Sequence, residues 1–169
     1  MKYLITIALI LLTCSLAAFD ELSLEHFSGK TAFVNDFPFL ETASGAQYRL
    51  LLAPQNLLDS LGIAFEEDAD LEVSGWLKGT LLLVKELKIA DRTFSLRDAT
   101  QKDLYTHQSD RTVDPDTCIS CWLCIRQCPV EAISRKNGKA RVDPALCIDC
   151  GICSEGHARF KGCPVNAIE

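Results

Sequence analysis

Eight of the nine cysteines lie in two short runs in the last third of the 169-residue chain. The first run has the spacing Cys-x2-Cys-x2-Cys-x3-Cys-Pro, at Cys118, Cys121, Cys124 and Cys128. The second run repeats the triplet and places its last cysteine after nine residues, at Cys147, Cys150, Cys153 and Cys163. A Cys-x2-Cys-x2-Cys loop can present three thiolates to one 4Fe-4S cube, and the fourth thiolate must come from elsewhere.

The segment from Val113 to Ile168 resembles the bacterial-type ferredoxins that carry two 4Fe-4S clusters. In that family the cysteine before each proline crosses over to the other cluster. The resemblance implies a first cluster bound by Cys118, Cys121, Cys124 and Cys163. It implies a second cluster bound by Cys147, Cys150, Cys153 and Cys128.

The same segment contains an internal duplication. Residues 113–115 recur as 142–144, and residues 128–133 recur with one change as 163–168. Such a repeat predicts two copies of one supersecondary unit, residues 111–138 and 139–169, related by a pseudo-twofold axis. We expect each Cys-Pro to open a short helix, because proline suits the first helical position. The 59 residues from Arg111 onward are too few for a large apolar core, so cluster binding must supply much of the folding free energy.

Two features depart from the family pattern. Residues 154–162 form an insertion in the second run, which is interpreted as either a tolerated surface loop or a loop that docks a partner or shields a cluster. Trp122 stands where the second run has Gly151. Because glycine eases the backbone around a cube, we expect the first loop to be strained or turned differently. We expect Trp122 to pack over its own cluster.

Other chemistries are weighed against the iron–sulfur interpretation. Exported proteins use even numbers of cysteines for disulfides, but a disulfide framework does not call for two triplets each closed by Cys-Pro. Zinc sites use paired Cys-x2-Cys ligands, and a third cysteine three residues on is then surplus. A radical-generating single cluster leaves one iron without cysteine, whereas here every position is supplied. Two 4Fe-4S clusters are therefore the predicted cofactors.

Residues 1–18 have the pattern of a secretory signal peptide: Lys2, an apolar stretch and small residues before Asp20. We expect cleavage after Ala17 or Ala18. The alternatives are lipid attachment at Cys14 or an uncleaved membrane anchor, although the apolar stretch is short for a span of about 20 residues. Each alternative places the folded body outside, in the periplasm or on the outer side of the cytoplasmic membrane.

That localisation conflicts with the predicted cofactors. Folded proteins that already carry clusters leave by a twin-arginine route, and the leader has no Arg-Arg pair. Either the chain is exported unfolded and receives its clusters afterwards, or the interpretation of residues 1–18 as a leader is wrong.

Residues 19–110 have no cysteine and differ in composition from the rest. They hold 16 acidic and 8 basic residues, whereas residues 111–169 hold 7 acidic and 8 basic residues. Strands are predicted at 31–34, 48–52, 71–77 and 81–89, with Phe94 and Leu96 in a further strand. A helix is predicted to begin at Pro54 and to end at Gly62. Lys85 interrupts the apolar face of the strand at 81–89, which suggests a bulge or an edge.

This order of strands and helix resembles the small OB-type barrels of exported bacterial proteins. The predicted fold class is therefore α+β, with an OB-like barrel domain at 19–110 followed by the ferredoxin-like module at 111–169. OB folds often bind oligonucleotides or sugars, but the net negative charge of residues 19–110 would repel a phosphate backbone. We therefore predict no nucleic-acid partner and expect the barrel to dock the module on its partner.

The predicted function is single-electron transfer to and from a redox protein partner. The basic residues Arg135, Lys136, Lys139 and Arg141 could attract an acidic partner or the acidic part of the same chain. No nucleotide loop, nucleophile constellation or pocket signature is found, so we predict no catalysis by this chain alone and no small-molecule substrate. The alternatives are an iron–sulfur subunit or assembly factor of a membrane redox complex, and clusters that are structural or sense oxidants.

Overall fold

The computed structural model describes residues 22–169. The predictions for residues 1–18, including cleavage and the role of Cys14, lie outside the described residues. Within the described part, none of the helices has the length and apolar character needed to cross a membrane.

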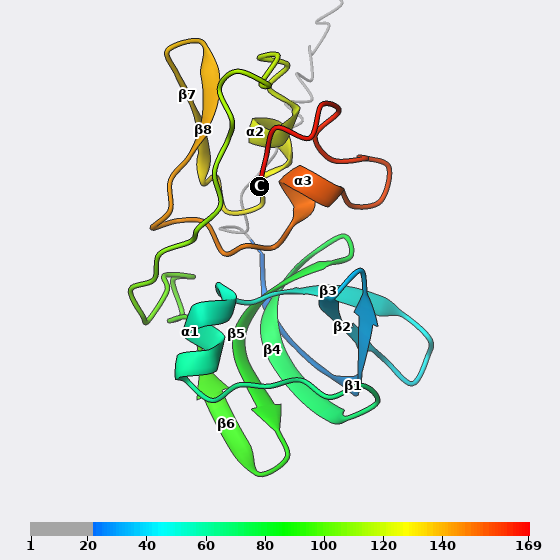
Figure 1. Ribbon diagram of the computed structural model, residues 1–169. Helices are drawn as coiled ribbons and strands as arrows, with labels where there is room; N and C mark the ends of the chain where they lie inside the picture. Colours follow the sequence, from blue (N-terminus) through cyan, green and yellow to red (C-terminus); the bar gives the residue numbers. More distant parts are fainter. Residues whose placement is uncertain (1–21) are drawn as a thin grey trace, which may run out of the picture.

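The chain folds into two sheet-containing parts, which Figure 1 shows one above the other. The lower part holds one helix, α1 (Gln55–Ser60), and a six-stranded sheet. Its strands are β1 (Leu24–Val34), β2 (Phe37–Glu41), β3 (Gln47–Leu51), β4 (Asp70–Lys78), β5 (Leu81–Ile89) and β6 (Arg92–Ser95). The upper part contains α2 (Leu123–Gln127), β7 (Ile133–Lys136), β8 (Lys139–Val142) and α3 (Ile152–Glu155).

The strands of the lower part are joined in a ring of neighbouring pairs. The sheet has the order β3-β2-β1-β4-β5-β6, and β3 also pairs in parallel with β5. β1, β2, β3 and β4 therefore each pair with two other strands, and β5 pairs with three, β3, β4 and β6. The helix α1 lies in the connection between β3 and β4.

Most of the predicted elements in this part are present. The strand predicted at 81–89 is β5, and the register of β4 with β5 skips Lys85, which confirms the predicted bulge. The predicted helix is α1, with Pro54 at the position just before it and Gly62 in a left-handed conformation just after it. β2 was missed, because Pro38 disguises its apolar pattern.

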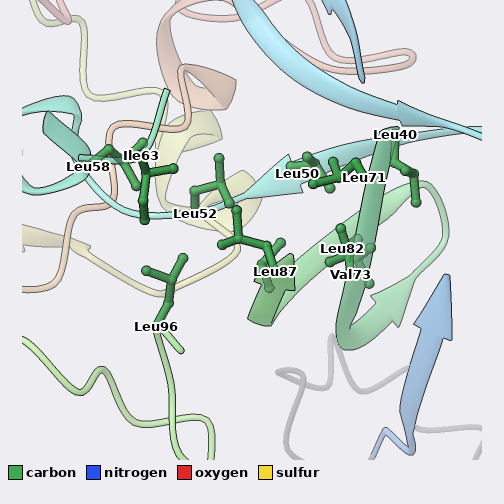
Figure 2. Close-up of a cluster of buried hydrophobic side chains, with 11 residues drawn as sticks. Leu40, Leu50, Leu52, Leu58, Ile63, Leu71, Val73, Leu82, Leu87 and Leu96 are labelled. Carbon is green, nitrogen blue, oxygen red and sulfur yellow. The ribbon is translucent and has the colours of Figure 1, made fainter. Parts of the chain in front are cut away.

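The core of the lower part lies between these strands and α1. Alternating side chains of β4 and β5 point into it, as strand geometry requires, and residues of β2, β3 and α1 join them (Figure 2). The fully enclosed members include Leu40, Leu82, Val84 and Leu87. On β4 the expected alternation fails after Val73, because Ser74, Gly75 and Trp76 are all buried.

The upper part has the internal symmetry that the duplication predicts. Ile133 pairs with Val142 in the β7–β8 hairpin, and the equivalent residues of the two repeats, Ile168 and Val113, form an isolated bridge. The amide of Asp143 donates to the carbonyl of Ala132 over 2.7 Å, and the equivalent bond from Asp114 to Ala167 is 2.8 Å. Each repeat therefore completes its hairpin-like pairing with a strand segment from the other repeat.

The helices of the upper part do not lie where we predicted them. Each Cys-Pro is followed by a turn, at residues 129–130 and 164–165, so the predicted helices are wrong. The helical turns precede the crossing cysteines instead and carry Cys124 and Cys153. Val130, Ile133 and Ile168 pack on the cysteine-lined core, whereas Val165 is half-buried.

Candidate iron–sulfur site

The first group of cysteines lines one small cavity of the upper part. Its walls include four sulfur-bearing side chains, Cys118, Cys121, Cys124 and Cys163, together with Trp122 and Ile168. Three of the cysteines come from the first run and one from the end of the second run. The negative charges of the Cys121, Cys118 and Cys163 thiolates contribute to raising the pKa of Cys124, after the larger effect of burial. Cys163 is thus brought to the first triplet.

The second group contains the other four cysteines. Burial raises the pKa of Cys153 to about 12, and the charges of Cys147, Cys128 and, more weakly, Cys124 add to the effect. Burial also raises the pKa of Cys150 to about 12, with added contributions from Cys128 and Cys153. Cys128, the last cysteine of the first run, therefore lies near the second triplet. The influence of Cys124 on Cys153 reflects how close the two groups are.

Equivalent residues turn the two loops. Ser120 and Asp149, which follow the first cysteine of each triplet by two positions, both have left-handed backbones with φ of 60° and 51°. Trp122 has φ 62° and ψ 14°, and Gly151 has φ 69° and ψ −3°. The prediction of a differently turned first loop is therefore wrong. The expected strain is present, because a left-handed residue with a side chain costs about 1 kcal/mol or more.

Backbone amides point at the sulfur atoms of both crossing cysteines. The amide of Ala132 donates to Cys128 Sγ, and the amide of Ala167 donates to Cys163 Sγ, each over 3.3 Å. Amides of Ala140 and Ser120 lower the pKa of Cys118, and the Lys139 charge assists them. Donors of this kind stabilise thiolates and would also tune a cluster bound by them. The donor set therefore fits an iron–sulfur group.

The alternative chemistries fit the geometry less well. All eight cysteines among residues 22–169 are free thiols. In the same range, no three His, Cys, Asp or Glu side chains converge closely enough to hold a single metal ion. A 4Fe-4S cube differs from such an ion, because each cysteine binds a different iron atom of the cube. When bound, such a cube supplies a reversible one-electron couple.

The lower part of the molecule covers the second group of cysteines. Arg49 of β3 is 5 % exposed, and its guanidinium donates to the carbonyl of Cys150 over 2.5 Å and to the carbonyl of Gly156 over 3.1 Å. The same guanidinium lies over the Phe37 ring at 4.1 Å. Desolvation lowers the pKa of Arg49, and the Cys150 thiolate opposes that effect. A buried cation from the sheet therefore holds the loop of the second triplet.

Phe37 makes a second contact with that loop. A Cβ atom added to Gly151 would lie 2.1 Å from Phe37 Cζ, so only glycine fits there. Trp122, at the equivalent position of the first repeat, lies under the guanidinium of Arg135 at 4.5 Å. Trp122 also lines the cavity of the first cysteine group, in line with the expectation that it packs over that site.

An apolar contact completes this junction. Leu51, Trp76 and Leu83 of the sheet pack against Ile148 and Ile152 of the second repeat. This contact explains why Trp76, on the face of β4 opposite the core, is only 4 % exposed. Burial of several large apolar side chains of this kind stabilises by about 1.5 to 3 kcal/mol each.

The insertion at 154–162 belongs to the same junction. Its His157 and Phe160 pair through two backbone hydrogen bonds of 3.0 Å. The Nε2 atom of His157 lies 2.9 Å from the Thr80 hydroxyl, in the turn between β4 and β5. Phe160 packs on the apolar contact described above. The insertion therefore packs against the sheet of its own chain. This result is closer to the interpretation as a docking loop than to that as a tolerated surface loop.

Sequence reasoning missed Arg49 and Phe37. The available signal for Arg49 was weak: a charged residue lies between Tyr48 and Leu50 in a predicted strand, at a position that turned out to be buried. Phe37 carried no signal, because nothing in the sequence places it beside Gly151.

Comparison with known proteins identifies part of this site. Residues 111–134 match the family model described as a 4Fe-4S binding domain. No curated protein and no solved structure gave a match to the chain. Residues 111–134 are therefore a ferredoxin-like iron–sulfur segment of the class that serves electron transfer. This match covers the first cysteine run and leaves the second to be judged from the structure.

Proposed function

We propose that the protein transfers single electrons through two 4Fe-4S clusters. The first cluster would be held by Cys118, Cys121, Cys124 and Cys163. The second would be held by Cys147, Cys150, Cys153 and Cys128. The observation that carries the proposal is the exchange of the last cysteines between the two groups, because a fourth thiolate from the other run is what a triplet lacks.

The chain's own residues would shape both sites. The left-handed turns wrap each loop around its site, and the amides of Ala132 and Ala167 donate to the crossing sulfur atoms. The buried thiols of Cys150 and Cys153, with pKa values of about 12, would lose their protons when iron is bound. The apolar residues around the cysteines, such as Ile133 and Ile168, limit the access of water.

Iron and acid-labile sulfide per chain, measured on anaerobically prepared protein, test this proposal. Two clusters require about eight of each per chain, and one cluster requires about four. A reductive titration followed by electron spin resonance would then report whether both clusters accept electrons. Colourless protein with zinc or disulfides in place of iron would end the proposal.

We propose that residues 19–110 form an OB-like barrel that docks the module at residues 111–169 on its partner. The ring of strand pairs and the helix between β3 and β4 support this assignment. The excess of acidic residues in this part argues against a nucleic-acid partner. The proposed partner is a redox protein, and we propose no small-molecule substrate and no catalysis by the chain itself.

The protein is proposed to act outside the cytoplasm, with residues 1–18 as its export signal or membrane attachment. A second candidate function is a permanent subunit, or an assembly factor, of a larger membrane redox complex. The exposed apolar side chain of Ile119 in the first repeat, which is 59 % exposed, favours that candidate. Purification from the native membrane separates the two: a free monomer reducible by dithionite supports a shuttle, and obligate co-purification supports a subunit.

A further inference from the structure

The two repeats offer equivalent surfaces, of which the sheet covers one. Ile148 and Ile152 of the second repeat are 3 % and 2 % exposed, because the sheet packs on them. The equivalent residues of the first repeat are Ile119, which is 59 % exposed, and Leu123, which is half-buried. Within residues 22–169, the apolar surface that the sheet covers in the second repeat is therefore exposed in the first repeat.

The open surface differs from its covered counterpart in charge. Arg135 and Lys139 contact residues of this surface, and three more exposed basic residues, Arg126, Lys136 and Arg141, lie on α2, β7 and β8. Lys139 donates to the carbonyl of Cys118 over 2.6 Å, and Arg135 lies over the Trp122 ring. Among residues 22–169 none of the five forms an ion pair with a carboxylate. In the described part of the chain, no ion pair with a carboxylate therefore neutralises these five charges.

We propose that this surface, with Ile119, Trp122 and Leu123 at its centre and the five basic residues as its rim, docks an acidic redox protein that exchanges electrons with the first cluster. The inference rests on the proposed function. In each exchange the first cluster is oxidised by one electron and the one-electron centre of the partner is reduced by it, or the reverse. No bond forms or breaks and no proton is required.

The charge of this surface and the junction within the chain both favour an acidic protein as the partner. An apolar centre with a charged rim is the common plan of protein interfaces, and complementary rim charges steer the encounter. The junction at the second repeat follows the same plan, because Leu51, Trp76 and Leu83 cover Ile148 and Ile152 while one cation satisfies the loop carbonyls. A nucleic acid would match the cations but would leave Ile119 unexplained, and both a nucleic acid and an anionic lipid surface would meet the acidic sheet.

The test compares two small electron acceptors of opposite charge. The whole chain has a net charge of −6, so its overall field predicts faster electron transfer to a cation. The basic residues around the first cluster instead predict faster electron transfer to an anion. Reduced protein is mixed in a stopped-flow instrument with tris(oxalato)cobaltate, an anion, or with hexaamminecobalt, a cation, at several ionic strengths. We expect the rate with the anion to fall several-fold as salt rises, because the attraction is screened.

Two charge-matched variants locate the effect. R135E/K136E reverses two rim charges, and K30E/K88E reverses two exposed lysines of the sheet that pair with Asp70 and Glu72. Both variants change the net charge by the same amount. We expect R135E/K136E to abolish the preference for the anion and K30E/K88E to retain it. Equal behaviour of the two variants, or a wild-type preference for the cation, overturns the proposal.

A second measurement does not depend on electron transfer. Tris(oxalato)chromate is a paramagnetic anion that broadens the amide resonances of the residues it approaches. We expect broadening at β7, β8 and Ile119 before any at β1–β6, and its loss in R135E/K136E. Broadening spread evenly over the chain would count against the surface. Salt-sensitive binding to anionic phospholipid vesicles, lost in R135E/K136E, would overturn the proposal in favour of a membrane surface.

The iron and sulfide analysis keeps this result separate from the proposed function. If the protein contains about eight iron and eight sulfide per chain but shows no preference for the anion, only the proposed docking surface is contradicted. If the protein contains no clusters, the proposed function itself is contradicted.

Discussion

The two halves of the iron–sulfur part share one local design and have different surroundings. Each wraps its cysteines with left-handed residues at the same positions and donates an amide to its crossing sulfur over 3.3 Å. The second half is covered by the sheet, through Arg49, Phe37 and an apolar contact. Among residues 22–169, Ile119 of the first half is exposed, whereas the equivalent Ile148 of the second half is buried.

This difference indicates how a duplicated unit can acquire two roles. Burial and hydrogen bonds to the loop change the potential of a bound cluster, as does a nearby positive charge. The covered half therefore suits an internal site whose properties are set by the sheet. The open half suits exchange with a partner. The following predictions test whether the halves differ in this way.

The largest effects are expected from the crossing cysteines. Cys163→Ser should remove the first cluster and Cys128→Ser the second, so each variant should hold about four iron atoms per chain in place of about eight. Cys128→Ser should also weaken the junction with the sheet, because the second loop carries Ile148 and Ile152. Iron analysis and hydrogen exchange of the sheet measure the two effects. Equal loss of protection in both variants would contradict the proposed difference between the halves.

Gly151→Ala should destabilise the folded protein by about 2 to 4 kcal/mol. The added methyl would meet Phe37 and would occupy a backbone with φ 69°. Trp122→Gly, at the equivalent position, should destabilise less than Gly151→Ala, because the relief of a left-handed backbone offsets part of the lost contacts with Arg135 and the cavity of the first cysteine group. Urea unfolding under anaerobic conditions measures both variants.

The double variant Gly151→Ala/Phe37→Leu is the control for that prediction. If the methyl group acts by meeting the Phe37 ring, the double variant should be less destabilised than the sum of the single variants. Strict additivity would mean that backbone strain alone accounts for the loss.

Arg49→Met should lower the reduction potential of the second cluster and leave the first unchanged. The lost positive charge no longer stabilises the more negative reduced form, and about 59 mV corresponds to a tenfold change in a one-electron equilibrium. The carbonyls of Cys150 and Gly156 also lose their donor, which should cost about 2 kcal/mol of stability. Redox titration followed by electron spin resonance gives both potentials.

Arg49→Lys separates charge from contact, since it keeps the positive charge but not the two-pronged donor. We expect its second cluster to titrate closer to the wild type than that of Arg49→Met. If both variants leave the two potentials where they were, Arg49 has only a structural role.

The smallest effect concerns pH at the insertion. Burial, and then the charge of Arg49, lowers the pKa of His157 below its usual value of about 6.5. The folded protein therefore favours the neutral ring, and its contribution to stability is present above about pH 6.5 and is lost as the pH falls. We expect the melting temperature to fall slightly more between pH 7.5 and pH 5.5 in the wild type than in His157→Gln. If the melting temperatures of the two proteins change equally with pH, His157 does not contribute to the stability of the junction.

Much of the local structure could be predicted from residue types alone. The strand at 81–89 and its bulge at Lys85 follow from the interruption of an apolar pattern by one lysine. The helix between Pro54 and Gly62 follows from its start and stop residues. The predicted Cys-Pro helices failed because a proline permits a helix without requiring one, and the chain turns there toward the hairpin pairing.

The sequence by itself determined the cysteine chemistry and the duplication, because both depend on spacing along the chain. Tertiary structure alone decided that the repeats are unequal. Arg49 and Cys150 are about a hundred positions apart in the chain, and so are Phe37 and Gly151. No sequence pattern relates residues that are so far apart in the chain. They meet only because the ring of strand pairs places β3 and the first residue of β2 beside the loop of the second cysteine triplet. The burial of one repeat and the exposure of the other follow from that meeting.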